Sequence, residues 1–496
     1  MDLLTPRALA SPHRLALIWG QHTLTYRRLA EHTAALAQRL RREGITKGTR
    51  VAALLSKSPE AVALIHALAQ LDAVIVPLNL RLTPGEMAAQ IERSRATHVV
   101  ATEAAAAQAR MVAQARPLLE ITPAIWQHTL PLAPTAPQPA QFVAQTPLAI
   151  LFTSGTTGQS KAAVLTAANF YWSAVGSAYR LGVFPEDRWL LTLPLYHVGG
   201  LSILFRSALY GTTVVLPDAA ATTSFDPTRL YETLVAHKVT LVSLVPTMLH
   251  RLLAAVDAPP PPHLRTVLLG GAATPNDLLH TAQARGYPVA LTYGLTEATS
   301  QVATATPAEV RRKPGSVGHP LLLTEVQVVD EHGHPMPPGA IGEIVVRGPT
   351  VFAGYDQDPK ATQAALRSGW LHTGDLGYLD ADGALWMVNR RNDLIVTGGE
   401  NVYPAEVETV LRQHPAVADV CVVGLDDAEW GQRVAAAVVL HPNQRTTPAA
   451  LETHCREHLA GYKIPRLIRI VPDLPRTASG KVKRGAVRNL LMRGEG

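Results

Sequence analysis

The 496-residue sequence is poor in cysteine, with only Cys421 and Cys455. Two cysteines cannot build the disulfide framework of a small secreted protein, and neither lies in a CxxC pair or a Cys/His cluster that would indicate a zinc site. The N-terminal residues contain no clean apolar core, and charged residues interrupt the most apolar later stretch, residues 51–80. We therefore expect no disulfides, no signal peptide, no membrane span and a reducing, cytoplasmic environment.

The sequence also has little charge, with 17% charged residues. The hydrophobic share of 47% indicates a globular protein and no disordered composition. The formal net charge is +6, but the basic residues are scattered except between Lys463 and Arg488. We interpret this distribution as a solvated surface and not as a nucleic-acid-binding face. A phosphorylated small ligand near the C-terminal part would account for the basic cluster.

Strand-like and helix-like segments alternate along most of the chain. Helical patterns end near Gly44 and Gln70, and a further one follows Pro246. The strand-like segments are residues 50–55, 73–78, 240–246, 266–272 and 288–294. This rhythm predicts an α/β fold, with a large N-terminal body of mixed or parallel sheets flanked by helices.

Three changes of texture suggest the organisation around that body. Residues 101–146 are rich in Ala, Gln and Pro, which predicts an irregular connection. Short strands and Gly/Pro turns after Val317 predict a β-rich subdomain. Residues 404–459 have their own helix and strand alternation, which predicts a small α+β domain. The predicted division is a body over 1–389, a hinge region at 390–391 and a mobile C-terminal lid over 392–496.

The sharpest local feature is LFTSGTTGQSKAAV at 151–164, where an apolar strand runs into a turn rich in Ser, Thr and Gly. Closely spaced glycines let successive backbone N–H groups point at one anion, and hydroxyls and a lysine add donors. The segment therefore suits a polyphosphate, although it is not a Walker A loop, because GxxxxGK[ST] is absent. The candidate phosphate ligands are Thr153, Ser154, Gly155, Thr156, Thr157, Gly158 and Lys161.

The string TSGTTGQSK resembles the phosphate loop of the adenylate-forming superfamily of acyl-CoA synthetases, luciferases and peptide-synthetase adenylation domains. Similar later motifs follow in the family's order, namely YGLTE at 293–297, TGD at 373–375, NRRNDLIVTGGENVYPAEVE at 389–408 and PRTASGK at 475–481. The resemblance spans nearly the whole chain. It implies an acid–CoA ligase that uses ATP, Mg²⁺ and coenzyme A and forms an acyl-adenylate.

The resemblance also implies roles for individual residues in the nucleotide site. Glu297 would bind Mg²⁺, a hard cation that prefers oxygen ligands. Tyr293 would offer a ring face to adenine, and Thr296 would donate to the α-phosphate, whose negative charge grows during the attack. Asp375 and Arg390 would hold the ribose.

A moving lid would serve the second half-reaction, because one step expels pyrophosphate and the other admits a thiol. The family's hinge position falls here on Asn392, where Asp or Lys is more usual. Lys481 is the expected catalytic lysine, since a mobile ammonium suits the charge shared by carboxylate, α-phosphate and pyrophosphate. The expected pantetheine channel is formed by Gly398, Gly399, Glu400 and Asn401. The complete catalytic set is Lys481, Glu297, Thr296 and His197.

The apolar stretch at 193–216 contains a single guanidinium, that of Arg206. Arginine is rarely left in such a stretch without an anionic partner, because an unpaired buried charge is costly. An acid with a second carboxylate would supply that partner. The alternatives are an arginine that reaches the surface or one that pairs with a structural Asp.

At subfamily level, PLYHVGGLSILFRS, TEATSQ and GGENVYPAEVE resemble the 2-succinylbenzoate–CoA ligases of menaquinone (vitamin K2) biosynthesis, whose substrate is a dicarboxylate. This implies ligation of 2-succinylbenzoate to coenzyme A, with AMP and pyrophosphate as the other products. The implied acyl-binding residues are His197, Arg206, Gly270, Gly271 and Ser300. Ala162 departs from the family pattern, which usually has Gly after the loop lysine.

Three alternatives stay open: an aryl- or medium-chain acyl-CoA ligase of the same superfamily, a non-catalytic nucleotide-binding paralogue, and an adenylation domain that loads a carrier protein. The intact Glu297, Asp375 and Lys481 argue against the second. The expected partners are ATP, coenzyme A and a small carboxylic acid, with no nucleic acid and no membrane. A homo-oligomer is one option for the assembly.

Overall fold

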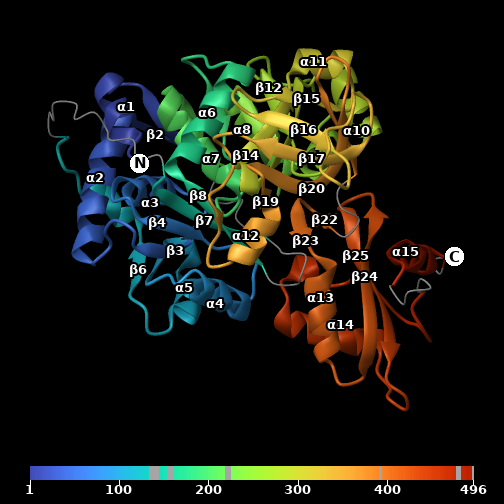
Figure 1. Ribbon diagram of the computed structural model, residues 1–496. Coiled ribbons are helices and arrows are strands. Elements are labelled where there is room, and N and C mark those ends of the chain that lie inside the picture. Colours follow the sequence, from blue (N-terminus) through green and yellow to red (C-terminus); the bar gives the residue numbers. More distant parts are fainter. Residues whose placement is uncertain (133–144, 154–159, 218–224, 390–393, 476–481, 494–496) are drawn as a thin grey trace. The chain divides into compact units, whose positions relative to one another are not determined.

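The computed structural model describes residues 1–496 apart from 133–144, 154–159, 218–224, 390–393, 476–481 and 494–496 (Figure 1). The chain forms two compact units. The large unit comprises Met1–Leu80, Gln90–Leu151 and Ala162–Asn389. The small unit comprises Arg81–Ala89, Phe152–Lys161 and Arg390–Gly496.

The largest sheet of the large unit is mixed. Its strands are β1 (Leu15–Trp19), β2 (His22–Thr25), β9 (Arg188–Leu190), β10 (Thr213–Val215), β11 (Leu241–Leu244), β12 (Thr266–Leu269), β13 (Val289–Leu295), β14 (Ser300–Ala305), β15 (Ser316–Pro320), β16 (Glu325–Val329), β17 (Gly342–Arg347), β19 (Leu366–Arg367), β20 (Trp370–Leu379) and β21 (Leu385–Asn389). The order is β16-β17-β20-β21-β15-β14-β13-β12-β11-β9-β10-β1-β2, with β19 beside β20. The neighbours from β13 to β1 run parallel, and the pairs from β13 to β16 are antiparallel.

A second sheet has the order β18-β8-β7-β4-β3-β5-β6. Its strands are β3 (Arg50–Leu54), β4 (Val74–Pro77), β5 (His98–Thr102), β6 (Leu118–Ile121), β7 (Pro147–Thr153), β8 (Lys161–Thr166) and β18 (Gly354–Tyr355). The strands from β7 to β6 pair in parallel, whereas β18 runs antiparallel to β8. The predicted α/β body with parallel and mixed sheets is confirmed.

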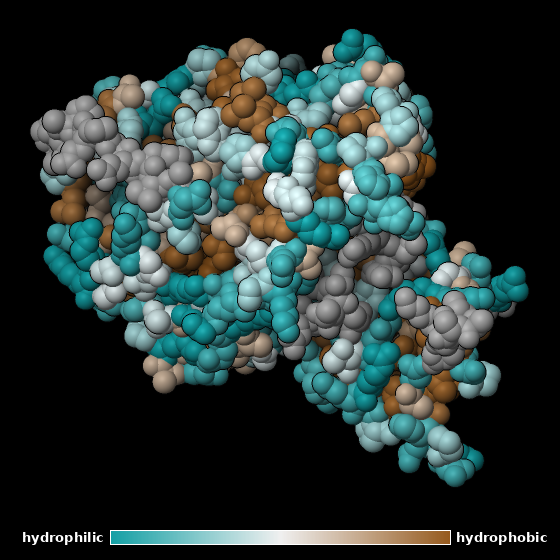
Figure 2. Space-filling view, viewed as in Figure 1, coloured by the Kyte–Doolittle hydropathy of each residue, from teal (hydrophilic) through white to brown (hydrophobic). Residues whose placement is uncertain are grey.

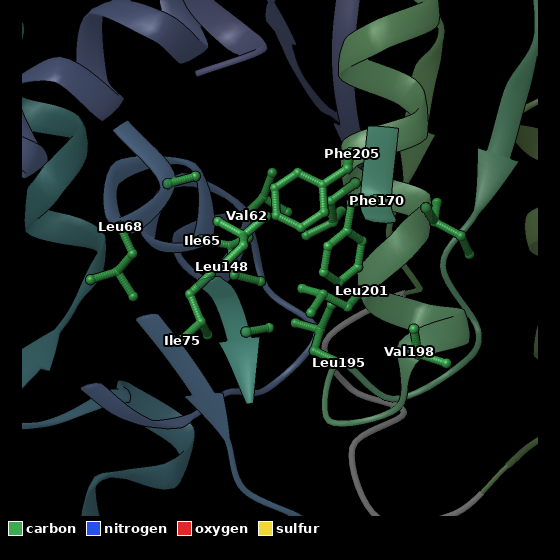
Figure 3. Close-up of a cluster of buried hydrophobic side chains, with 14 of the residues drawn as sticks. Val62, Ile65, Leu68, Ile75, Leu148, Phe170, Leu195, Val198, Leu201 and Phe205 are labelled. Atoms are coloured by element: carbon green, nitrogen blue, oxygen red, sulfur yellow. The ribbon is translucent and has the colours of Figure 1, made fainter. Parts of the chain in front are cut away.

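Helices separate and cover these sheets. They are α1 (Leu4–Ala10), α2 (Tyr26–Arg42), α3 (Pro59–Gln70), α5 (Ala106–Ala113), α6 (Ala167–Leu181), α7 (Val198–Tyr210), α8 (Pro227–Ala236), α9 (Pro246–Ala255), α10 (Asn276–Ala284), α11 (Pro307–Arg312) and α12 (Pro359–Ala365), while α4 (Pro84–Arg93) contains residues of both units. One buried cluster joins α3 and β7 to α6 and α7. Figure 3 shows this contact, with Val62 and Ile65 facing Phe170 and Phe205.

The parallel strands of the largest sheet alternate between two apolar cores, because successive side chains of a strand point to opposite faces. Leu268 of β12 belongs to the core beside α6 and α7. Its neighbours Val267 and Leu269 belong to a second core, which includes residues of α8, α9 and α10. Burial on both faces explains why these strands read as continuous apolar runs in the sequence.

The prediction of an irregular connection over 101–146 is wrong for much of its length. This part contains the helix α5, the strand β6 and the short 3₁₀ helices η1 (Glu103–Ala105) and η2 (Pro123–Gln127), and the proline-rich stretch 133–144 lies outside the described residues. Val112 is buried, and β6 completes the parallel sheet beside β5. The alanine-rich composition hid a regular βα unit, because alanine packs in helices without giving a clear apolar pattern.

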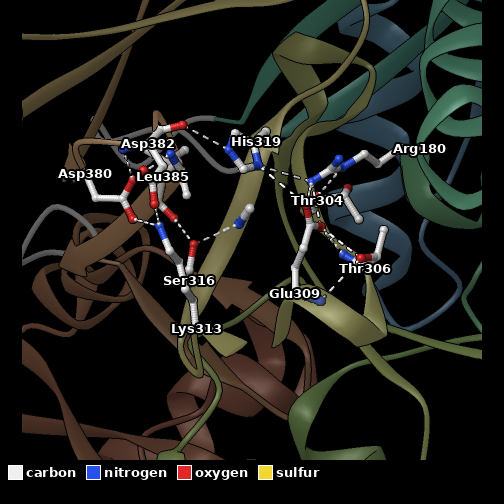
Figure 4. A network of polar contacts seen from close by, with 12 residues as sticks. Arg180, Thr304, Thr306, Glu309, Lys313, Ser316, His319, Asp380, Asp382 and Leu385 are labelled. Atoms are coloured by element: carbon white, nitrogen blue, oxygen red, sulfur yellow. Dashed lines mark hydrogen bonds and ion pairs between the residues drawn. The ribbon is translucent and has the colours of Figure 1, made fainter. Parts of the chain in front are cut away.

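The antiparallel part that follows β15 matches the predicted β-rich subdomain. A polar network at its end joins Lys313 to Asp380 (2.7 Å) and Asp382 (2.6 Å) (Figure 4). A second ion pair of 2.6 Å joins Arg180 of α6 to Glu309 of α11. These contacts brace the β20–β21 turn and the start of β15 against the helices.

The small unit has one sheet with helices on both faces. Its elements are β22 (Ile395–Thr397), β23 (Glu400–Val402), β24 (Val417–Asp427), β25 (Gly431–Leu440), β26 (Leu467–Ile470), α13 (Pro404–Gln413), α14 (Pro448–His458), η5 (Gly461–Lys463) and α15 (Arg484–Met492). The order is β23-β22-β25-β24, with β26 beside β25. Alternate residues of β24 and β25 face α13 and α14 or face α15. The helices and strands predicted over 404–459 are therefore confirmed.

The cysteines, the helix lengths and the surface can be compared with the sequence-based expectations. Both cysteines are buried and free. Across the described part of the chain, none of the helices combines the length and the apolar character needed to cross a membrane. Hydrophilic side chains are interspersed with apolar ones over the face drawn in Figure 2, in keeping with the solvated surface expected from the scattered charges.

Candidate active site

Several of the predicted nucleotide and acid ligands of the large unit follow parallel strands of its largest sheet. His197 follows β9, Gly270 and Gly271 follow β12, and the segment Tyr293–Glu297 ends β13 and enters the 3₁₀ helix η4 (Thr296–Ala298). These strands are parallel neighbours in the order β13-β12-β11-β9. Their carboxyl ends therefore lie together, which is where open α/β sheets bind ligands.

Two residues predicted to hold the nucleoside contact each other. The Tyr293 hydroxyl donates a 2.7 Å hydrogen bond to Oδ2 of Asp375. Asp375 lies on β20, and its backbone N–H donates to the Thr373 hydroxyl (3.1 Å). The neighbouring Gly374 has φ +72° and donates its N–H to Glu343 Oε1 (2.9 Å). The TGD motif therefore lies inside β20, and the bond between the Tyr293 hydroxyl and Asp375 holds the carboxylate at that ring.

The predicted magnesium ligand Glu297 is held by a residue that the sequence reasoning missed. The Tyr355 hydroxyl donates a 2.9 Å hydrogen bond to Oε1 of Glu297. The Glu297 carbonyl oxygen also accepts a 2.8 Å bond from the Phe352 N–H. Phe352 lies just before β18 and Tyr355 lies in it. The segment 349–356, which contains β18, therefore fixes both the backbone and the carboxylate of Glu297.

The same segment connects Glu297 to the strand that follows the phosphate loop. Tyr355 of β18 pairs with Ala163 of β8. The Asp356 N–H donates a 2.7 Å bond to the carbonyl oxygen of Ala162. Ala162 is buried inside β8, so the departure from the family's glycine falls on a regular strand position and not on the turn.

The first turn of α6 fixes the start of this segment. Thr166 and Asn169 form a capping box, and the Asn169 amide donates to the carbonyl oxygens of Pro349 (2.8 Å) and Val351 (2.9 Å). The helix that begins after the phosphate-loop strand therefore positions the backbone that holds Glu297.

The turn after Glu297 has an uncommon conformation. Thr299 and Ser300 have φ angles of +51° and +89°, a region that costs energy for residues other than glycine. The Ser173 hydroxyl of α6 donates a 2.7 Å bond to the Thr299 carbonyl oxygen, and the Thr299 hydroxyl donates a 2.8 Å bond to the carbonyl oxygen of Thr350. These bonds hold a strained turn that presents Glu297 on one side and Ser300, predicted to contact the acid, on the other.

Arg206 is buried in α7, with 2% of its surface exposed. Its Nη2 donates to the Ser173 hydroxyl at 3.2 Å, and its guanidinium carbon lies 5.7 Å from the centre of the Trp189 ring. Its Nε has no hydrogen-bond partner, and it forms no ion pair with any residue that the structure describes. Burial lowers the pKa of Arg206, and the nearby Tyr210 phenol opposes this shift. Neither a surface-reaching arginine nor a structural aspartate partner is found among these residues.

The other residues predicted to line the acyl pocket, His197, Gly270 and Gly271, are described by their backbone contacts and conformations. His197 precedes the first turn of α7, and its carbonyl oxygen accepts bonds from Gly200 and Leu201 (both 3.0 Å). A side chain at Gly270 would lie 2.7 Å from the Thr292 methyl carbon, so only glycine fits between β12 and β13. Gly271 has φ +82° and is exposed.

The predicted pantetheine residues form a hairpin in the small unit. Gly398 (φ +57°) and Gly399 (φ +83°) make the two-residue turn between β22 and β23, where Thr397 pairs with Glu400. A side chain on Gly398 would meet the Trp430 ring at 2.8 Å. Glu400 is 5% exposed, so its carboxylate is largely withdrawn from solvent, whereas Asn401 is exposed.

Several predicted residues lie outside the described residues. They are Ser154, Gly155, Thr156, Thr157 and Gly158 of the predicted phosphate loop, Arg390, the predicted hinge residue Asn392 and the catalytic candidate Lys481. The ends of the loop are described: the Thr153 hydroxyl lies 3.5 Å from the Lys161 carbonyl oxygen. Tyr355, Ser173 and Trp189 are the contacts that sequence reasoning missed, and none of them belongs to a charged or glycine-rich motif.

Comparison with known proteins identifies close relatives. The family model for AMP-binding enzymes matches residues 4–356, and the model for their C-terminal domain matches residues 406–481. A 2-succinylbenzoate–CoA ligase of Geobacillus kaustophilus (strain HTA426) is 41% identical over 499 residues, with 99% of this chain and 98% of that protein covered.

Two solved structures are similar over the full length. A double mutant of the o-succinylbenzoate CoA synthetase from Bacillus subtilis, bound with its product analogue OSB-NCoA, has a TM-score of 0.89 and 36% identity, with 98% of each chain covered. The synthetase from the same organism in complex with ATP and magnesium ion has a TM-score of 0.72 and 36% identity, with 99% of each chain covered.

Proposed function

Because the chain belongs to the AMP-binding enzyme family, we propose that it catalyses the ATP-dependent ligation of 2-succinylbenzoate to coenzyme A. In the first step a carboxylate of the acid attacks the α-phosphorus of ATP, which gives the acyl-adenylate and releases pyrophosphate. In the second step the thiol of coenzyme A attacks the acyl carbon, which gives 2-succinylbenzoyl-CoA and releases AMP. The relatives named for this acid support the choice of substrate, and menaquinone biosynthesis is the role that follows from it.

The observation that carries the choice of acid is the state of Arg206. A buried guanidinium with an unsatisfied Nε lacks a carboxylate partner among the described residues. Breaking or omitting a buried charge pair costs several kcal/mol, so such a group favours an anionic ligand. The second carboxylate of 2-succinylbenzoate supplies that anion. A monocarboxylic acid would place no anion beside Arg206, so the energetic cost of burying the unpaired guanidinium would remain.

Different residues near Arg206 contact different parts of the acid. Ser300 and Arg206 bind the polar end of the acid, and Ser173 links them because its hydroxyl contacts both Arg206 and the Thr299 carbonyl oxygen. His197 closes the acyl pocket, while Gly270 and Gly271 form its floor. The glycines suit this role because a Cβ at Gly270 would already collide with Thr292.

The nucleotide contacts follow from the strand ends. Asp375 accepts hydrogen bonds from the ribose hydroxyls, Arg390 donates to the ribose oxygens, and Tyr293 packs on the adenine. Thr296 and Lys161, with the loop residues Thr153 to Gly158, donate to the phosphates, whose negative charge increases during the first step. The bond between Tyr293 and Asp375 supports this assignment, because it already aligns the two groups that would meet one nucleoside.

Glu297 fits a magnesium ion. Its carboxylate offers the hard oxygen donor that Mg²⁺ prefers, and Tyr355 orients it through a 2.9 Å hydrogen bond. When bound, the ion would neutralise phosphate charge. The strained Thr299–Ser300 turn keeps this carboxylate at the end of β13.

We also propose that the C-terminal part of the chain acts as the lid, with the body over 1–389, the hinge at 390–391 and the lid over 392–496. Lys481 then stabilises the first transition state, and Gly398, Gly399, Glu400 and Asn401 line the path of the pantetheine thiol. The hairpin supports this role, because two adjacent glycines with positive φ permit a close approach of the thiol arm. The cytoplasm is the proposed location, since ATP and coenzyme A are available there.

A pyrophosphate-release assay with a panel of acids tests the proposal. The informative acids are 2-succinylbenzoate and its two monocarboxylic analogues, one without the ring carboxylate and one without the aliphatic carboxylate. We expect 2-succinylbenzoate to be the best substrate. The analogue that lacks the reacting carboxyl should release no pyrophosphate, and the other should react with a lower kcat/KM. Equal turnover of plain aryl or medium-chain acids would favour the rival acyl-CoA ligase instead.

The two half-reactions test Lys481 separately. Lys481→Ala should abolish acyl-adenylate formation but transfer a supplied acyl-adenylate to coenzyme A at a nearly unchanged rate. Lys483→Ala is the matched control, because it removes a neighbouring lysine of the same basic segment. Full adenylation by the Lys481→Ala enzyme would contradict the assignment.

A further inference from the structure

The helix α14 of the small unit places three potential metal ligands on one face. They are His454, Glu457 and His458, whose spacing of three and four residues makes them neighbours on a helix. One ligand atom from each lies within 4.8 Å of the others. Glu457 and His458 are exposed and His454 is half-buried, so a dissolved ion can reach the group.

Both imidazoles are held with one nitrogen ready to bind. His454 Nε2 lies 3.0 Å from the Val410 carbonyl oxygen, and His458 Nδ1 lies 2.8 Å from the His454 carbonyl oxygen. A carbonyl oxygen can only accept, so these nitrogens carry the protons. In the neutral rings, the lone pairs are therefore on His454 Nδ1 and His458 Nε2. Metal-bound histidines are usually oriented in this way, with the other ring N–H donating to a backbone carbonyl, a carboxylate or water.

Two neighbouring side chains are not suited to join the group. His414 packs edge-on against His454 at 5.4 Å, and its Nδ1 accepts a 3.2 Å bond from the Ala416 N–H. Its lone pair is thus already in use. Cys455 is fully buried in the apolar core, and burial raises the pKa of its thiol to about 12, so it stays a protonated core residue.

We propose that His454 Nδ1, Glu457 and His458 Nε2 form a binding site for a first-row divalent transition-metal ion such as Zn²⁺. Two imidazoles and one carboxylate suit Zn²⁺, Ni²⁺ or Cu²⁺, and they do not suit Mg²⁺, which prefers oxygen ligands throughout. Three protein ligands leave a fourth position for water. Because His454 also contacts Val410 of α13, the ion ties α14 to α13 and stabilises the small unit.

Titration of the metal-stripped full-length protein with ZnCl₂, without ATP, tests the site. Calorimetry should detect a zinc site that His458→Ala and Glu457→Gln weaken by about tenfold or more, a change typical of losing a metal contact. Zinc should also raise the thermal midpoint of the wild-type protein, whereas the same concentration of MgCl₂ should not. Both substitutions are at exposed positions, so the variants should fold normally.

His334→Ala is the matched control. His332 and His334 form another exposed histidine pair, with ring centres 6.1 Å apart, but they lie outside the cluster. This variant should bind zinc as the wild type does. The proposal is overturned if His458→Ala and Glu457→Gln bind zinc with wild-type affinity, or if His334→Ala alone removes the binding. The readout needs no catalysis, so it is independent of the proposed ligase activity.

Discussion

Replacing Arg206 with methionine should lower activity much more than stability. The Arg206 side chain is 2% exposed, and its Nε–H is unsatisfied. Removing a buried unsatisfied donor gains about 1–3 kcal/mol. Losing the contact with the Trp189 ring at 5.7 Å costs about 0.5–2 kcal/mol. The hydrogen bond from Arg206 Nη2 to Ser173 is lost as well, at about 0.5–1.5 kcal/mol. Because these contributions largely cancel, we expect the ligand-free Arg206→Met protein to be about as stable as the wild type.

Activity should fall steeply in the same variant. A carboxylate brought into the pocket without its guanidinium would be an unpaired buried charge, at a cost of about 3–5 kcal/mol. Since about 1.4 kcal/mol corresponds to a factor of ten, kcat/KM for 2-succinylbenzoate should fall by roughly a hundredfold to a few thousandfold. The analogue without the non-reacting carboxylate carries no charge at this position, so its turnover should be unchanged or improved.

Urea denaturation and thioester formation measure the two effects. Arg206→Lys is the matched control: it keeps a cation but loses the planar fork, so it should retain an intermediate activity. The reasoning is refuted if Arg206→Met turns over 2-succinylbenzoate as well as the wild type does. It is also refuted if the variant loses activity equally on both acids, because the arginine would then support the fold and not the second carboxylate.

Three further changes test individual contacts. Tyr355→Phe removes the hydrogen bond to Glu297, which is worth about 1.5–3 kcal/mol for a charged acceptor. Saturating the enzyme should then require at least roughly ten times the Mg²⁺ concentration, and an unchanged Mg²⁺ dependence would argue against Glu297 as the ligand. Ser173→Ala leaves the Thr299 carbonyl oxygen without this donor, so KM for the acid should rise several-fold while KM for ATP changes less. Equal rises would contradict a specific role of Ser173 in the acid pocket. Burial lowers the pKa of His66 to about 4, so the unfolded chain takes up a proton between about pH 6.5 and 4 that the folded protein does not. The free energy of unfolding should therefore fall by about 3 kcal/mol as the pH drops through this window, and His66→Gln should remove that part of the pH dependence.

The sequence predicted those parts of the fold that depend on local pattern. The parallel strands of the largest sheet are buried on both faces, so each appears as a short apolar run such as residues 266–269. The helix α13 and strand β24 also follow directly from their periodicity. The failure at α5 has the opposite cause, because its alanine-rich face gives no apolar pattern that distinguishes a helix from a linker.

Candidate site residues could be predicted from the sequence only where a chemically suitable side chain lies in a recognisable motif. Tyr293 and Asp375 belong to recognisable motifs, although nothing in the sequence shows that they contact each other across 82 residues. Tyr355 and Ser173 are ordinary residues of a strand and a helix, and they reach the site through long-range packing. Periodicity cannot reveal such partners, since their role depends on where the chain returns in space.

The two-residue strand β18 has a consequence for which sequence changes the enzyme can tolerate. Its backbone pairs with β8 while the Tyr355 side chain holds Glu297. Successive side chains of a strand point to opposite faces, so deleting or inserting one residue here would turn the phenol away from the carboxylate. Loops elsewhere can change in length, but a change in the spacing from Phe352 to Asp356 would remove the support of the Glu297 carboxylate, the proposed metal ligand.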